Sequence, residues 1–439
     1  MLSKFIGSVR LKVITAITAL LLVSSIVPVG FINLQVSSSS SDLECRVLYF
    51  FNGIVVYNST ISTTLALETP GNISLVEGFE QTVVGLVTYN VVFNESVGMF
   101  TFNITEGEYF EGFFISELRI CVKPQQLTLL QKALRNPMSS ELPDERTIPQ
   151  EILENYVKTP YSRVVEEVKP HFEDWFKKRY FVSVDRARYA GIAVTAGFFV
   201  YQEFIKYDPA SLPRTIDEVI ETRRGDCDDM SRVLVELLNS YGIPALIAYG
   251  YVYIKNFNYT VTLENVTYIF INNGPHGFTL SYIPGFGWLS LDFLAYSLIV
   301  YPFVFESYTR VTEVNKEAVE EVVQLHRKIN ATQVFGIFDE SEVKQLIGYP
   351  ITLDNALRFF NKLLKGYLDT QESQNETFTE TSAETTHEIT RESSEITSSV
   401  EFAHGEKPFL SYTIIALILV AATTALIVTL LLAHLVKRK

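Results

Sequence analysis

Three short runs carry side chains that could form a thiol-based active site. They are Arg-Arg-Gly-Asp-Cys-Asp-Asp-Met-Ser at 223–231, Pro-His-Gly-Phe at 275–278 and Gly-Trp-Leu-Ser-Leu-Asp at 287–292. Cys227 offers a nucleophilic sulfur, His276 a base, and Asp292 a carboxylate that can orient the base. Together, these residue types could attack a carbonyl group and form a thioester.

The sequence places Cys227 in the first turn of a helix. Apolar residues recur after it at steps of three and four, and Gly242 followed by Pro244 ends the pattern. Asp226 is a suitable N-cap. At this position the helix dipole favours a thiolate, and the backbone N–H of Cys227 is a candidate donor to an oxyanion.

Charged residues on both sides of the cysteine act in opposite directions. Arg223 and Arg224 could favour the thiolate, whereas Asp228 and Asp229 oppose it, so an imidazolium partner is needed. The acidic residues could suggest a metal site, but they lack the glycine and terminal glutamate of a calcium loop. We expect a solvated cap cluster and no metal. The sequence also has no zinc spacing or nucleotide loop, so no cofactor is expected.

Among the six histidines, His276 is the best-placed base. The others lie in low-complexity or membrane-proximal segments or on amphipathic helices, where solvated or packing roles are expected: His387, His404, His434, His171 and His326. His276 begins an alternating run, and a turn at 284–287 leads to a second run that ends at Asp292. The two residues are nearly equidistant from that turn, so a hairpin would bring them together.

The cysteine and histidine runs, together with Gly-Ile-Pro-Ala at 242–245 and the Gly-Trp motif, resemble the transglutaminase-like superfamily. The resemblance spans about 150–305, and its specific part lies at 212–293. It implies an α+β, papain-like core with Cys227 as nucleophile, His276 as base and Asp292 as orienting acid.

Two further positions bear on this resemblance. Trp288 matches a packing position of the superfamily. Gly277 and Phe278 follow the histidine where many members have Ala and Trp, so a small and an aromatic residue are kept.

The resemblance implies a thiol enzyme that acts on a protein or peptide, as a peptidase or amide hydrolase rather than a cross-linking enzyme. The alternative is a non-catalytic surface adhesion or scaffold protein that uses the same fold.

The pattern along the chain predicts seven segments. They are a signal peptide or N-terminal anchor (1–36), a β-rich, sandwich-like extracellular domain (43–122), the transglutaminase-like domain (127–305), a helical appendage (311–368), a disordered Ser/Thr/Glu-rich stalk (371–408), a transmembrane helix (410–433) and a basic cytoplasmic tail (434–439).

Both ends of the chain suggest membrane targeting. Residues 13–32 are mostly apolar and follow three basic residues, as in a secretory signal. Residues 410–433 form an uncharged stretch, and a helix of this length can cross a hydrocarbon layer of roughly 30 Å. The basic residues after them favour the cytoplasmic side, so the rest of the chain should lie outside the cell membrane.

Cysteine and asparagine patterns agree with an extracellular location. Cys45 and Cys121 bracket the β-rich segment and could form a disulfide, although two unpaired thiols are also possible. Eight asparagines lie in Asn-x-Ser/Thr sequons, which suits a glycoprotein. They are Asn58, Asn72, Asn94, Asn103, Asn258, Asn265, Asn330 and Asn375. The net charge of −14 argues against a nucleic-acid partner.

Overall fold

The structure is a computed structural model that describes residues 44–75, 79–122, 126–143, 148–210, 212–294 and 302–366. The expected signal segment, stalk, transmembrane helix and basic tail lie outside the described residues, and so does Asn375. Within the described ranges, no helix combines the length and apolar character needed to span a membrane.

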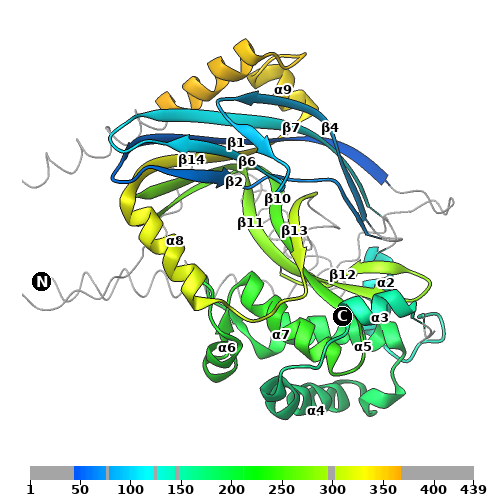
Figure 1. The fold of residues 1–439 in the computed structure, drawn as a ribbon. Helices are drawn as coiled ribbons and strands as arrows, with labels where there is room; N and C mark the ends of the chain where they lie inside the picture. Colours follow the sequence, from blue (N-terminus) through cyan, green and yellow to red (C-terminus); the bar gives the residue numbers. More distant parts are fainter. Residues whose placement is uncertain are drawn as a thin grey trace, which may run out of the picture. The chain divides into compact units, whose positions relative to one another are not determined.

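The strands of the described residues form one nine-stranded sheet and two smaller sheets (Figure 1). The large sheet has the order β13-β10-β11-β14-β1-β7-β4-β3, and β12 pairs with β11. Its strands are β1 (Glu44–Ser59), β3 (Ile73–Leu75), β4 (Phe79–Tyr89), β7 (Phe110–Val122), β10 (Ala245–Leu263), β11 (Val266–Ile283), β12 (Gly287–Ser290), β13 (Phe303–Thr309) and β14 (Ile329–Asp339). Adjacent strands are antiparallel except β11 and β14, which are parallel.

One half of the large sheet is covered on both faces. Strand β1 is buried continuously over 48–56, so its sequence is a nearly unbroken apolar run rather than an alternating one. On one face, alternate residues such as Phe50 pack with a three-stranded sheet of β2 (Thr63–Leu67), β6 (Met99–Ile104) and β5 (Val92–Asn94).

The other face of this half carries helices. Phe51 and Phe113 pack against Phe359 and Phe360 of a helical segment at 353–366. Helix α9 (Glu340–Leu346) contributes Val343 to the same cluster. Figure 1 shows these helices, in orange and yellow, lying over the sheet.

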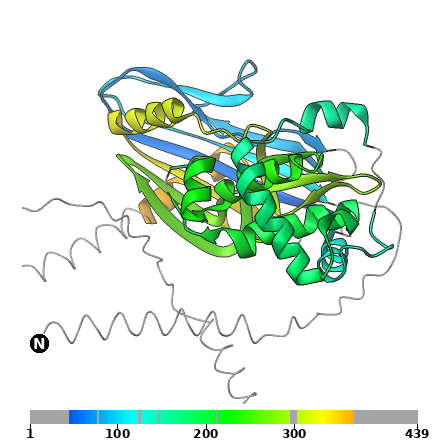
Figure 2. The ribbon, with the colours of Figure 1, turned by 90° about the horizontal axis from the view of Figure 1, so that it is seen from below.

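The other half of the sheet packs against a group of helices, seen together in Figure 2. They are α2 (Gln126–Arg135), α3 (Gln150–Tyr156), α4 (Lys169–Tyr180), α5 (Tyr189–Phe198), α6 (Ile216–Thr222) and α7 (Cys227–Asn239). π-Helical turns at Val164–Val168 and Phe199–Phe204 precede α4 and extend α5. Helix α7 lies in the core, with Met230, Leu234 and Leu237 fully buried, as its apolar stripe predicts.

The structure differs from the expected helical appendage at 311–368. Helix α8 (Lys316–Lys328) is present, but β14 follows it at once and lies in the middle of the large sheet, between β11 and β1. The last turn of α8 is basic, which suits a helix end, but no glycine or proline lies at its junction with β14 to interrupt the helical pattern.

The segment 43–122 likewise is not a separate domain: β2, β5 and β6 form a sheet of their own, but β1, β3, β4 and β7 belong to the large sheet. Its strands do pack face to face, as expected of a sandwich, but β1 also pairs with β14 over eleven residue pairs. Through β14 the sheet continues into β11, the strand that carries His276. Because backbone hydrogen bonds join the expected domains, the two halves share one sheet.

Candidate active site

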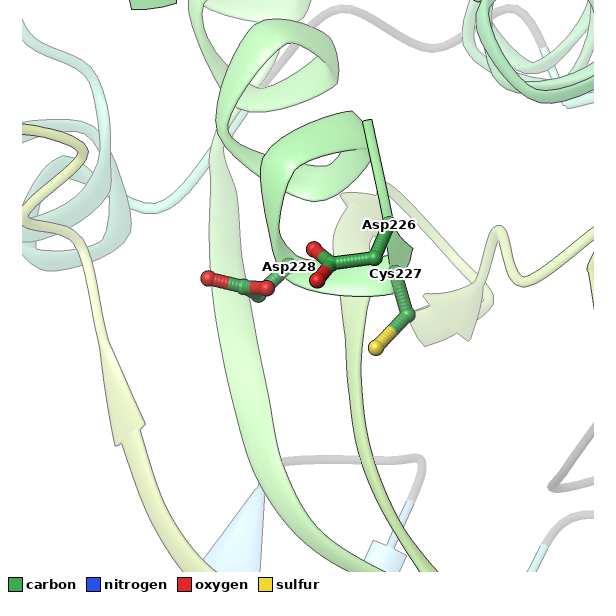
Figure 3. Close-up of side chains that lie close together, drawn as sticks. All are labelled: Asp226, Cys227 and Asp228. Atoms are coloured by element: carbon green, nitrogen blue, oxygen red, sulfur yellow. The ribbon is translucent and has the colours of Figure 1, made fainter. Parts of the chain in front are cut away.

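Helix α7 begins at Cys227, and a reciprocal cap fixes this start. The Asp226 carboxylate accepts a hydrogen bond from the Asp229 backbone N–H at 3.4 Å, and the Asp229 carboxylate accepts one from the Asp226 N–H at 3.2 Å. Such a capping box satisfies two amide groups that have no partner within the helix. In Figure 3 the Cys227 sulfur points away from the helix, while the Asp226 and Asp228 carboxyl groups lie beside each other.

Strand β11 and the segment after β12 bring the histidine and the third residue together. The pairing of Leu280 with Ser290 sets the register of this hairpin. His276 Nε2 lies 2.9 Å from Asp292 Oδ2, and both residues are buried. The second oxygen of Asp292 accepts the Leu294 N–H at 3.0 Å, which fixes the carboxylate.

Cys227 lies close enough to His276 for its charge and hydrogen bonding to affect the pKa of the imidazole. Cys227 is the free cysteine of the described residues and is only partly buried, so reagents can reach it. Burial lowers the pKa of His276, but the Asp292 carboxylate and hydrogen bonding and charge from Cys227 together raise it from 6.5 to about 10. Because Nε2 bonds Asp292, Nδ1 is left to face the thiol, as a thiolate–imidazolium pair requires.

Asp229 lies at the centre of an ion-pair network behind the cysteine. Its buried carboxylate pairs with Arg214 at 3.0 Å and with Arg232 at 3.1 Å, and it also accepts the Arg214 backbone N–H at 3.1 Å. Arg232 also pairs with Asp228. The expected helix cap is therefore present. The prediction that this cluster is solvated is wrong, because Asp229 is only 1% exposed.

These pairs change the electrostatic expectation drawn from the sequence. Arg214 and Arg232 balance the charges of Asp228 and Asp229, so these acids oppose a thiolate less than expected. Arg223 lies over the Phe204 ring, 3.7 Å from its centroid. Arg214 and Arg232 were not predicted from the sequence, although Arg232 stands three and four residues after Asp229 and Asp228, a spacing that favours ion pairs on a helix.

One oxygen each of Asp226 and Asp228 and the Cys227 sulfur lie within 4.8 Å of one another, as metal ligands could. Both carboxyl groups, however, have protein partners. Burial and hydrogen bonding to Asp228 raise the pKa of Asp226 from 3.8 to about 8. Burial also acts to raise the pKa of Asp228, but the bond from Asp226 and the charge of Arg232 lower it overall. The two acids therefore share one proton, which is a weak arrangement for holding a divalent cation.

Several tyrosines lie close enough to Cys227 for its charge to raise their pKa. Tyr207 pairs with Gly225 in the small sheet of β8 (Lys206–Tyr207) and β9 (Arg224–Gly225), and it is 48% exposed. Burial and then the charge of Cys227 raise the pKa of Tyr207 to about 12. These side chains stay neutral at physiological pH and offer aromatic surface beside the nucleophile.

Two other positions of the family resemblance have structural explanations. Trp288 is buried, with its ring edge-on to Tyr156 at 4.9 Å, which is a packing role. A Cβ on Gly277 would lie 3.1 Å from both Asp228 and Tyr249. Glycine therefore follows His276 because the neighbouring side chains leave almost no room for alanine.

Residues 188–293 match a family model described as the Transglutaminase-like superfamily. The match spans the segments that carry Cys227, His276 and Asp292, so the chain contains a transglutaminase-like domain. No curated protein matches the sequence significantly.

One solved structure similar to this chain is a protein from Cytophaga hutchinsonii that is provisionally described as a cysteine protease. The identity is 13% and the TM-score 0.39, over 68% of this chain and 93% of that one. A TM-score this low carries no argument, so the functional inference rests on the family match and on the site geometry. These support a thiol enzyme in general.

Proposed function

We propose that this protein is a cell-surface peptidase or amide hydrolase that uses Cys227, His276 and Asp292. One observation carries the proposal: the His276 ring bonds the buried Asp292 carboxylate at 2.9 Å, and the partly buried Cys227 lies close enough to help raise the pKa of that ring. A nucleophile, a base and an orienting acid in this order form the usual unit of thiol-based acyl transfer.

The chemistry follows from the positions of these groups. The Cys227 thiolate attacks the carbonyl carbon of a carboxamide or peptide and forms a C–S bond. The His276 imidazolium then gives its proton to the leaving nitrogen as the C–N bond breaks, which releases an amine and leaves a thioester. The neutral imidazole next takes a proton from water, and the water oxygen attacks the thioester. This step releases the acid and restores the thiolate.

Backbone groups at the start of α7 could stabilise the intermediate. The first N–H groups of a helix have no acceptor within the helix, and the helix dipole adds positive potential there. The Cys227 N–H therefore remains the candidate oxyanion donor.

Features remote from the site support an extracellular location. Cys45 and Cys121 form a disulfide, and they are paired neighbours at the ends of β1 and β7. Disulfides persist mainly in oxidising compartments. The sequon asparagines of the described residues are all exposed, as glycan attachment needs: Asn58, Asn72, Asn94, Asn103, Asn258, Asn265 and Asn330. With the expected anchor at 410–433, these features suit an ectodomain held outside the cell membrane.

The test is to trap the thioester. The detergent-solubilised full-length protein is incubated with peptides from a casein digest, quenched in acid and mapped by mass spectrometry. We expect new amines in solution and an acyl adduct on Cys227. Cys227→Ala should abolish both, whereas His171→Ala, an exposed helical histidine, should change neither. Amine release that persists in Cys227→Ala would refute the thiol mechanism. With no adduct and no release, the non-catalytic scaffold alternative would be favoured.

A further inference from the structure

Three buried hydroxyl groups lie directly behind the proposed catalytic residues. Tyr201, Ser231 and Thr279, which we call the hydroxyl cluster, are 3%, 0% and 0% exposed. They come from the π-helical turn after α5, from α7 and from β11, and their neighbours form a mainly apolar core. Burying a hydroxyl group in such surroundings is unfavourable unless it forms hydrogen bonds.

The bonds of Ser231 connect the nucleophile to the strand of the base. Ser231 Oγ lies 2.6 Å from the carbonyl oxygen of Cys227 and 3.3 Å from that of Gly277, the residue after His276. Tyr201 Oη lies 2.7 Å from Ser231 Oγ. A serine hydroxyl has one proton, so it donates mainly to the nearer carbonyl, of Cys227, while the tyrosine donates to the serine.

Thr279 extends the cluster to the third catalytic segment. Its hydroxyl donates to the Ser231 carbonyl at 3.3 Å, and its own carbonyl accepts the Leu291 N–H at 2.9 Å. Leu291 directly precedes Asp292. The residues of the hydroxyl cluster therefore bond all three catalytic segments: hydroxyl groups reach the carbonyls of Cys227 and Gly277, and the backbone carbonyl of Thr279 bonds Leu291.

The protonation state of Tyr201 suits this arrangement. Burial, and then the charge of Asp292, raise the pKa of Tyr201 well above its ordinary value, so its hydroxyl remains a donor. None of the three hydroxyl groups is needed as an acid, base or nucleophile in the proposed reaction.

We propose that the hydroxyl cluster is a positioning device that holds the Cys227 sulfur at the correct distance from the His276 imidazole. The inference rests on the proposed thiol chemistry. The capping box already fixes the start of α7, and the hydroxyl cluster adds bonds that link the Cys227 carbonyl, through Ser231, to Tyr201 outside the helix. A displacement of 1 Å in a catalytic group can reduce a rate by about 100-fold.

A purely structural role is the competing explanation. Serine in a helix often bonds the carbonyl four residues before it, as Ser231 does, without any part in chemistry. In that case, removing the hydroxyl would change stability but not the reactivity of the folded protein. Reactivity and stability must therefore be measured separately.

The experiment compares Tyr201→Phe and Ser231→Ala with the unmodified full-length protein. Tyr201→Phe removes only the oxygen and keeps the ring. Thr195→Val is the matched control, because Thr195 is also fully buried and bonds the carbonyl four residues before it, Gly191, at 2.7 Å. Three quantities are measured: the rate of iodoacetamide alkylation of Cys227 from pH 5 to 9, kcat and KM for amine release, and unfolding by urea.

We expect kcat to fall by about 10- to 100-fold in both variants, with KM within about twofold. The alkylation rate below pH 7 should fall together with kcat. Ser231→Thr, which keeps a hydroxyl, should recover most of the loss, and Thr195→Val should match wild type in reactivity whatever its stability.

Wild-type alkylation profiles and kcat values in both folded variants would overturn the inference while leaving the proposed function intact. A wild-type protein without enhanced alkylation at low pH would instead refute the proposed function itself. If Ser231→Ala does not fold, Tyr201→Phe decides the matter.

Discussion

The two halves of the large sheet are buried to a similar extent but filled with different residues. Around β1 and β7, the interior is mostly aromatic and aliphatic, with side chains such as Phe51 and Phe113, although Asn52 and Gln333 are also buried and bond each other at 3.0 Å. Around the start of α7 and the end of β11, the interior also holds Asp229, Ser231 and Asp292, each with hydrogen-bond partners. Burial of apolar side chains stabilises the fold without requiring a particular orientation. Buried polar groups are tolerated only when they have hydrogen-bond partners, and these bonds fix their positions. Both halves have an apolar core, but the second half also holds the paired charged groups beside Cys227 and His276.

The largest expected effect is on turnover in the polar half. His276→Ala removes the base and the partner of the thiolate, so kcat/KM for amine release should fall by about 10²- to 10⁴-fold. The urea midpoint should change far less than this loss of activity. His171→Ala, on an exposed face of α4, is the control and should leave turnover unchanged. If both histidine variants lost activity equally, the assignment of the base would be wrong.

The largest expected change in stability lies in the apolar half. Phe51→Ala removes a fully buried ring that contacts Phe113, Phe359 and Phe360, each at 5.6 Å between centroids. The free energy of unfolding should fall by about 3–5 kcal/mol. Cys227 alkylation in the folded fraction should not change.

Val92→Ala is the control for Phe51→Ala, because Val92 is 71% exposed and its loss should cost less than about 0.5 kcal/mol. An altered alkylation rate in folded Phe51→Ala would show that the two halves are not independent.

A smaller effect is expected for the buried ion pairs of the polar half. Asp229→Asn keeps the shape of the side chain but leaves Arg214 and Arg232 facing a neutral amide. The free energy of unfolding should fall by about 1.5–3 kcal/mol. Asp208→Asn is the matched control, since Asp208 pairs with the same arginine at 2.9 Å but is partly exposed. Its loss should cost less than about 1 kcal/mol. Equal losses of unfolding free energy in the two variants would mean that the burial of Asp229 does not strengthen its ion pairs.

The smallest expected effect is a pH dependence. The folded-state pKa of Asp226 is raised from 3.8 to about 8, so its contribution to stability is complete below pH 3.8 and is lost as the pH rises toward 8. The lowered pKa of Asp228 offsets part of this change. Between pH 5 and pH 8, the free energy of unfolding measured with urea should therefore fall more in wild type than in Asp226→Asn. Asparagine can still cap the helix in this variant. A steeper loss in Asp226→Asn would contradict the shared-proton assignment.

The sequence predicted the parts of the site that depend on local pattern. The helix after Cys227, the hairpin that joins His276 to Asp292, and the apolar run of β1 all have periodic or turn signals. The sequence did not predict β14, because no glycine or proline marks the end of α8. The Asp229–Arg232 pair lies within α7, but the Arg214–Asp229 pair and the hydroxyl cluster arise from packing between different segments, and Arg, Asp, Ser and Thr are usually exposed.

The central claim is that His276 holds Cys227 as a thiolate, and the pH dependence of alkylation tests it most directly. The rate of iodoacetamide reaction at Cys227 is measured from pH 5 to 10 in wild type and in His276→Ala. The account predicts fast wild-type labelling well below pH 8.5, the ordinary pKa of a cysteine, and loss of this low-pH reactivity in His276→Ala. A single rise near pH 8.5 in both proteins would contradict it.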